Sequence, residues 1–151
     1  MNSESANSAA NPLILQSRLS EISRIPPWIE ELASHHAIPE QTSYAIDLCL
    51  EEAVSNIVRH GHTSDSGATV TVTFLPDRGG FYTFVIEDTA PPFNPLLVPA
   101  PPLPTSLDKI SNGGHGIHLL RQFADAVEYE SMPTGNRLII SFLPPENARG
   151  T

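Results

Sequence analysis

The stretch from Ile46 to Phe74, IDLCLEEAVSNIVRHGHTSDSGATVTVTF, carries the clearest structural signal in the chain, because the spacing of its apolar residues changes along it. Its first half has the period of about 3.6 residues that marks an amphipathic helix, and we expect that helix to span residues 40–60. Gly61 follows the last periodic residue, where glycine commonly caps a helix. From Thr69 onward, valine and phenylalanine alternate with threonine, which predicts a half-buried antiparallel strand.

Shorter patterns extend this prediction in both directions. The further elements that we expect are a short strand at the start of residues 13–25, a helix from Pro26 to His36, a turn at 77–80, a strand at 81–87, a helix from 117 to 124, and strands at 127–131 and 137–143 around a turn at 133–136. Helices come first, followed by hairpin, loop, helix and hairpin. This order is typical of an α+β fold, a two-layer sandwich with helices on one face of a mostly antiparallel sheet.

Length and composition limit what the chain does. Its 151 residues suit one domain, which we expect at 13–143 between flexible tails at 1–12 and 144–151. A net charge of −9 argues against nucleic acid or an anionic membrane as the main partner and permits a partner with a basic surface. The single cysteine, Cys49, cannot form an internal disulfide, and no apolar run approaches the roughly 20 residues of a membrane span. We therefore expect a cytoplasmic protein.

The first candidate site lies within the strong helix. Glu52 and Asn56 are four residues apart, so their side chains are neighbours on one helix face. A carboxylate and an amide oxygen at the margin of an apolar stripe can hold a hydrated magnesium ion and a water molecule. The alternative is a solvated helix flank without a ligand.

Two more candidate sites follow along the chain. Asp88 ends a strand, and an ionised aspartate accepts hydrogen bonds only, so a buried one can read an exocyclic amino group; the alternative is a turn-forming aspartate. Residues 113–116, GGHG, precede a helix, where glycines allow close approach and free N–H groups bind phosphate; the alternative is a plain loop–helix joint. Residues 89–112 between them hold seven of the fifteen prolines, and so long a loop is usually functional or disordered.

The order of these patterns is more specific than any one of them. E-x-x-x-N on a helix is followed by D-x-A-x-P-F-N-P after a strand, then by GGHGIHLLR and by GNRLIISF. Over roughly residues 10–143 the chain resembles the GHKL (histidine kinase-like) ATPase superfamily. Within that superfamily it is most similar to bacterial anti-sigma-factor serine/threonine kinases of the RsbW and SpoIIAB type.

The resemblance implies ATP and Mg²⁺ as ligands and gives the residues roles. Glu52 takes the general-base position, Asn56 the magnesium position and Asp88 the adenine-reading position, while residues 91–112 correspond to the ATP lid. The other nucleotide-binding positions that it implies are Ala90, Gly114, His115, Gly116, Ile117 and Asn136.

Some positions depart from the family pattern. Ala90 stands where glycine is usual, and alanine adds a methyl group and disfavours a positive φ. Asn136 follows Gly135 where many relatives have a threonine that helps to hold adenine. Lys109 is the only cation in the expected lid, which leaves little charge for the γ-phosphate.

The resemblance leaves two functions open. One is a kinase that phosphorylates an anti-anti-sigma (STAS-type) antagonist and sequesters a sigma factor, which intact Glu52 and Asn56 favour. The other is a nucleotide-binding partner-switching module without kinase turnover. Either protein is expected to form a homodimer.

Three other residue patterns have simpler interpretations. His35 and His36 are expected to form a solvated cationic helix end, and Arg121 to face solvent from its helix. Cys49 is expected to be a small core residue.

Overall fold

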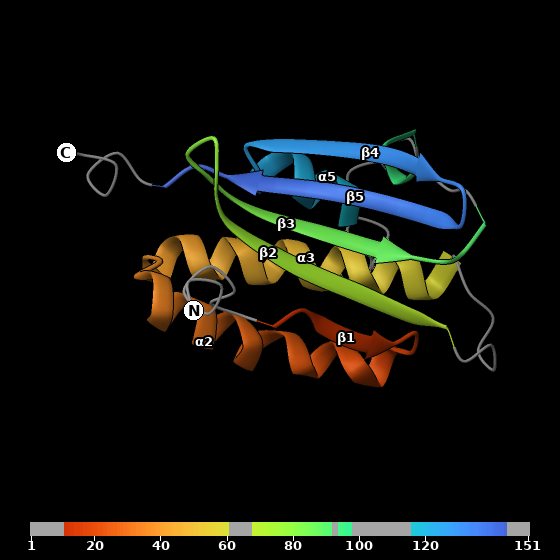
Figure 1. Ribbon diagram of the computed structural model, residues 1–151, viewed down its shortest axis with the longest axis horizontal. Coiled ribbons are helices and arrows are strands. Elements are labelled where there is room, and N and C mark those ends of the chain that lie inside the picture. The colour runs from red at the N-terminus through yellow and green to blue at the C-terminus, as the bar shows by residue number, and fades with distance from the viewer. Residues whose placement is uncertain (1–10, 61–67, 92–93, 98–115, 145–151) are drawn as a thin grey trace, which may run out of the picture.

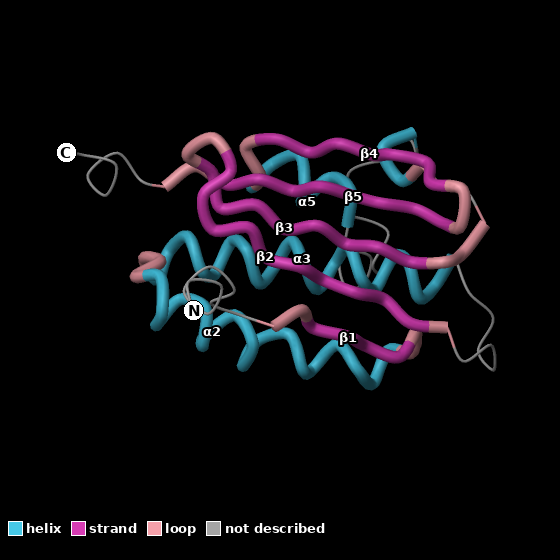
Figure 2. Tube along the Cα trace, viewed as in Figure 1, coloured by secondary structure: helices cyan, strands magenta, loops and turns pink. Residues whose placement is uncertain are grey.

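A computed structural model describes residues 11–60, 68–91, 94–97 and 116–144. The elements are β1 (Leu13–Gln16), η1 (Leu19–Arg24), α2 (Ile25–His36), α3 (Glu40–His60), β2 (Thr69–Arg78), β3 (Phe81–Asp88), η2 (Pro95–Leu97), α5 (Gly116–Phe123), β4 (Ala126–Met132) and β5 (Gly135–Phe142). Five antiparallel strands form one sheet in the order β1-β2-β3-β5-β4, and the helices lie on one of its faces (Figures 1 and 2). This arrangement confirms the expected α+β sandwich.

The core lies between α3 and the covered face of the sheet. The apolar stripe of α3 supplies buried Ile46, Leu50 and Val54. Opposite them the strands are in register, so that Phe84 of β3 pairs with Ile140 of β5 and both side chains are fully buried. Burying each such side chain contributes about 1.5–3 kcal/mol, so this alternation fixes which face of every strand points inward.

Most of the expected elements are confirmed, and α3 has the bounds that its periodicity predicts. The last turn is a correction, because the hairpin between β4 and β5 is tighter than the sequence suggests. Met132 pairs directly with Gly135 and Ser131 with Asn136, so Gly135 and Asn136 belong to β5 rather than to the turn. This difference matters for function, since it places Asn136 inside the sheet.

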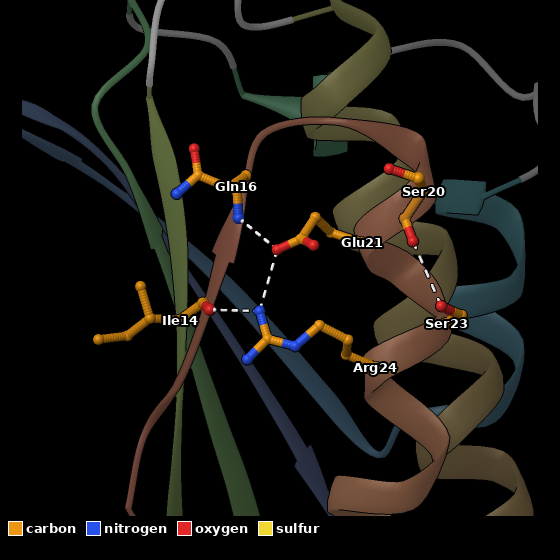
Figure 3. A network of polar contacts seen from close by, with 6 residues as sticks. All are labelled: Ile14, Gln16, Ser20, Glu21, Ser23 and Arg24. Carbon is orange, nitrogen blue, oxygen red and sulfur yellow. Dashed lines mark hydrogen bonds and ion pairs between the residues drawn. The ribbon is translucent and has the colours of Figure 1, made fainter.

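A polar network closes the outer edge of β1 (Figure 3). Arg24 in η1 donates from Nη1 to the carbonyl of Ile14 at 3.0 Å, and the backbone N–H of Gln16 donates to Oε1 of Glu21 at 2.9 Å. That N–H and the guanidinium of Arg24 also hold the pKa of Glu21 below its usual value. Because backbone groups of an edge strand otherwise invite pairing with another chain, η1 protects this edge. Its 3-10 turn is an element that the sequence patterns did not reveal.

The end of α2 departs from the expectation of a solvated cationic turn. His35 is exposed, but the ring of His36 is half-buried and lies edge-on to Phe74, with 5.0 Å between ring centroids. Burial, together with the neighbouring charge of His35, lowers the pKa of His36. The charged form of His36 is therefore disfavoured, because α2 packs this ring against the sheet.

No helix among the residues that the structure describes is long and apolar enough to cross a membrane.

Candidate functional site

The candidate site residues gather at one end of the molecule. The C-terminal ends of α3 and β3 and the first residues of β5 all lie at the same end of the sandwich (Figure 1). Asp88 is the last residue of β3, and it pairs across the sheet with Asn136 of β5. Two positions that are 48 residues apart in the sequence therefore face each other on the covered side of the sheet.

The buried carboxylate of Asp88 is fixed by two donors. The backbone N–H of Ala90 donates to its Oδ1 at 2.8 Å, and Nδ2 of Asn136 donates to the same oxygen at 3.0 Å. Both Asp88 and Asn136 are buried. Hydrogen bonds to an ionised carboxylate are stronger than neutral ones, so the side chain is held in one orientation before any ligand binds.

The amide of Asn136 has further partners. Nδ2 also lies 3.2 Å from the carbonyl oxygens of Ala90 and Pro91, and the hydroxyl of Tyr129 donates to Oδ1. Asn136, where the expected pattern has a threonine, thus ties β5 to the segment that follows β3. Tyr129 was missed by the sequence reasoning, because nothing in its local pattern separates it from an ordinary half-buried strand residue.

Gly135 lets the start of β5 come close to the end of β3. A Cβ atom at this position would lie 1.8 Å from the carbonyl oxygen of Asp88 and 2.8 Å from Cα of Thr89. Both atoms belong to the backbone, so neither can rotate away. Only glycine fits here, and the sequence had shown Gly135 simply as part of a longer motif.

The backbone at Ala90 does not adopt the positive φ that would favour a glycine there. Among the described non-glycine residues, Ala37 alone has a positive φ, at 53°. Ala90 is buried and uses its own N–H and carbonyl in the contacts with Asp88 and Asn136. A methyl group at this position is therefore compatible with the geometry of the site.

The flank of α3 carries the other two predicted residues. Glu52 and Asn56 are both half-buried and lie one helical turn apart. Glu51 is next to Glu52 in the sequence but points about 100° away around the helix, because an α-helix has about 3.6 residues per turn. The carboxylate that shares a face with Asn56 is therefore that of Glu52.

Glu51 belongs instead to an acidic pair on the opposite flank. Burial, a hydrogen bond with Asp47 and the charges of Asp47 and Glu52 raise the pKa of Glu51 to about 7. Oδ1 of Asp47 is buried and has no hydrogen-bond partner among the described residues. Nearby, Cys49 is buried as expected, and its burial raises the thiol pKa to about 12, which leaves it unreactive.

Magnesium fits this flank only in company with a nucleotide. The described residues contain no group of three or more His, Cys, Asp or Glu side chains that would hold a metal ion alone. Mg²⁺ prefers oxygen ligands and usually takes one or two from the protein and the others from phosphate and water. The half-buried amide of Asn56 suits that role.

The start of the expected lid is partly described. Asn94 accepts a hydrogen bond from the backbone N–H of Leu96 at 2.9 Å, and Pro95 is buried. Arg121 of α5 donates to the carbonyl of Leu96, so this exposed residue anchors the segment rather than simply facing solvent. Of the phosphate-facing positions, Gly116 and Ile117 begin α5.

Other lid and phosphate positions lie outside the described residues. These are 92–93 and 98–115, which include Lys109, Gly114 and His115.

A cavity of about 240 Å³ opens beside this anchored segment. It is lined by Leu96, Arg121 and residues 124–127, and neither Asp88 nor Asn136 contributes to it. The cavity is therefore separate from the polar cluster at the end of β3.

Comparison with known proteins agrees with the architecture. A family model described as the histidine kinase-like ATPase domain matches residues 15–142, which is most of the chain. The chain belongs to this family. It is 31% identical over 114 residues to the serine/threonine-protein kinase BtrW of Bordetella bronchiseptica, an alignment that covers 76% of this chain and 80% of BtrW.

Two solved structures share the fold. One contains the RsbU and RsbW domains of a Mycobacterium tuberculosis protein, with a TM-score of 0.59, 13% identity and 89% of this chain covered. The other is a blue-light activated histidine kinase of Erythrobacter litoralis, with a TM-score of 0.54, 13% identity and 87% of this chain covered. This chain spans 33% of the first protein and 43% of the second, so both likenesses concern one domain of a longer chain.

Proposed function

We propose that this protein is an ATP-dependent serine/threonine kinase and anti-sigma regulatory factor of the partner-switching kind. The observation that carries the proposal is the buried Asp88 carboxylate, held by Ala90 and Asn136 at the end of the molecule where α3 also ends. A fixed acceptor in a buried position suits the exocyclic amino group of adenine. The kinase name of BtrW, with 31% identity over most of both chains, supports the reaction class.

Each part of the site has a role in this proposal. Asp88 accepts from the adenine amino group, and Asn136 keeps the carboxylate oriented. Glu52 accepts the proton of the attacking hydroxyl group. Asn56 would help to hold Mg²⁺, which when bound neutralises charge on the phosphates. Phosphoryl transfer depends mainly on positioning and charge stabilisation, so a few well-placed groups suffice.

The phosphate-facing residues remain part of the same proposal. Gly116 and Ile117 at the start of α5, together with Gly114 and His115, would present backbone N–H groups to the triphosphate. A helix N-terminus carries unpaired N–H groups and a partial positive charge, both of which favour an anion.

The proposed partners are proteins. The substrate would be a serine or threonine of an anti-anti-sigma (STAS-type) antagonist, and the second partner a sigma factor. The net charge of −9 favours a partner with a basic surface over nucleic acid or an anionic membrane. A homodimer in the cytoplasm is the proposed working form.

The test is transfer of labelled phosphate from γ-labelled ATP to the antagonist. Replacing Glu52 by Gln should lower the transfer rate by about 10²–10⁴-fold while leaving ATP affinity nearly unchanged, because a general base acts on the attacking hydroxyl group. Glu51→Gln is the matched control on the other helix flank and should change the rate less than about twofold.

Two outcomes would contradict the kinase. If the wild-type protein binds ATP and the antagonist but transfers no phosphate, the protein is a nucleotide-binding partner-switching module without turnover. If Glu51→Gln abolishes transfer and Glu52→Gln does not, the base has been assigned to the wrong flank of α3.

A further inference from the structure

The amide of Asn136 has two possible orientations, and its surroundings accept only one. Three acceptors lie around Nδ2: Oδ1 of Asp88 at 3.0 Å and the carbonyl oxygens of Ala90 and Pro91, each at 3.2 Å. If the amide turned over, its own oxygen would face these three oxygens and no hydrogen bond would form. The side chain is buried, so water does not readily replace the lost bonds.

Tyr129 holds the other end of this amide. Its hydroxyl donates to Oδ1 of Asn136. Tyr129 sits on β4 opposite Leu138 of β5, so its ring is placed by the sheet register and its hydroxyl reaches along the covered face. The three acceptors at Nδ2 define the orientation of the amide, and the hydroxyl of Tyr129 adds a bond that holds the amide in that place.

We propose that Tyr129 is a positioning residue for recognition of the nucleotide base. It fixes the amide of Asn136, which in turn fixes the carboxylate of Asp88. This inference rests on the proposed nucleotide-binding function and adds a residue that the family pattern does not provide. An asparagine at this position has a longer side chain than a threonine, and the hydroxyl of Tyr129 restrains its outer end through the bond to Oδ1.

The chemical consequence is selectivity for purines that carry an amino group at position 6. A carboxylate held in place only accepts hydrogen bonds, so it binds the 6-amino group of adenine and repels the 6-keto group of hypoxanthine. When the amide of Asn136 loses the bond from Tyr129, it holds the carboxylate less firmly and the discrimination weakens. Preorganisation of this kind strengthens binding by removing the cost of ordering the site.

The experiment is a calorimetric titration with Mg²⁺-ADP and Mg²⁺-IDP. Tyr129→Phe should weaken ADP binding about three- to tenfold, as expected for loss of one hydrogen bond, and should weaken IDP binding less. The matched control is Tyr82→Phe on β3, whose half-buried hydroxyl lies outside the network and whose removal should change ADP affinity less than about twofold.

A second background separates positioning from general stability. In Asn136→Thr there is no amide to orient, so adding Tyr129→Phe should change ADP affinity no further. A structural role for Tyr129 would instead lower affinity in both backgrounds alike. In the wild-type protein, the side-chain NH₂ resonances of Asn136 should also be slow to exchange, and Tyr129→Phe should accelerate that exchange.

Three results would overturn the positioning role of Tyr129. If the wild-type protein binds ADP, and Tyr129→Phe binds each nucleotide with the same affinity as the wild-type protein, the positioning role is wrong and the proposed function stands. If Tyr129→Phe has the same effect in the Asn136→Thr background, Tyr129 does not act through Asn136 and the role is wrong. If the wild-type protein binds neither nucleotide, the proposed function fails and the positioning role fails with it.

Discussion

The end of β3 and the flank of α3 hold their side chains in different ways. At the end of β3, Asp88 and Asn136 come from strands far apart in the sequence, are buried, and are bonded to each other and to nearby backbone. On α3, Glu52 and Asn56 are half-buried and belong to a single helix, so helix geometry alone sets their separation. The first region depends on tertiary structure and the second on secondary structure. Substitutions should therefore disturb folding in the first region and chemistry in the second.

Gly135→Ala should have the largest effect on folding. The added Cβ would lie 1.8 Å from the carbonyl oxygen of Asp88, so β3 and β5 must separate. We expect a loss of about 3 kcal/mol or more in the free energy of unfolding, together with loss of nucleotide binding, measured by urea denaturation and calorimetry.

Gly79→Ala is the matched control in the hairpin between β2 and β3. Its φ of 65° strains alanine, but no described atom beyond the two neighbouring residues lies within 4 Å of the added Cβ. We expect a cost of about 1–2 kcal/mol without loss of nucleotide binding. Equal destabilisation by the two substitutions would show that the close approach at Gly135 has no special importance.

Asn56→Ala should be next in size and should leave the fold intact. Because this amide would help to hold a magnesium ion, which would neutralise charge on the phosphates, we expect ATP affinity to fall about tenfold in the presence of Mg²⁺. Without Mg²⁺ the variant and the wild-type protein should bind ATP equally weakly. A loss of affinity that is the same with and without the metal would remove Asn56 from the magnesium position.

The acidic pair on the opposite flank should give a smaller effect that depends on pH. Burial and Asp47 raise the pKa of Glu51 from its usual value of 4.5 to about 7. A raised pKa means that the folded state favours the protonated form, so this stabilisation is complete below pH 4.5 and is lost as pH rises through about 7.

Glu51→Gln tests this pair because it cannot ionise. Relative to the variant, the wild-type protein should lose on the order of 1 kcal/mol of unfolding free energy between pH 5 and pH 8.5. This value is smaller than the free energy that the pKa shift alone would give, because solvent screens a partly exposed carboxyl group. Urea denaturation of both proteins at several pH values measures this loss. Parallel pH profiles for the two proteins would mean that Glu51 titrates normally.

The sequence predicted the flank of α3 better than the end of β3, because the first depends on secondary structure and the second on tertiary structure. The 21 residues of α3 follow from hydrophobic period alone, and the spacing of Glu52 and Asn56 follows from the helix. The predicted β4–β5 turn ends too late, because Gly135 and Asn136 are turn-forming residues by local preference. Pairing with Ser131 and Met132 overrides that preference.

No local sequence pattern could predict the contacts of Asp88. Sequence reasoning identified Asp88 and Asn136 separately, but their hydrogen bond joins residues 48 positions apart, and only the sheet register brings them together. Tyr129 depends on the same register. Ala90 departs from the family's usual glycine, and its backbone does not have the positive φ that would favour glycine.

The most direct test of the central claim, that the end of β3 reads adenine, is a calorimetric titration of Asp88→Asn with Mg²⁺-ADP beside the wild-type protein. The wild-type protein should bind, and the variant should bind about ten- to a hundredfold more weakly, because an amide places a donor or a weaker acceptor where a charged acceptor meets the amino group. Asp77→Asn, in the hairpin turn where Oδ1 accepts from the N–H of Gly80 at 3.3 Å, should bind like the wild-type protein. Equal affinity of Asp88→Asn and the wild-type protein, or no binding by the wild-type protein, would contradict the claim.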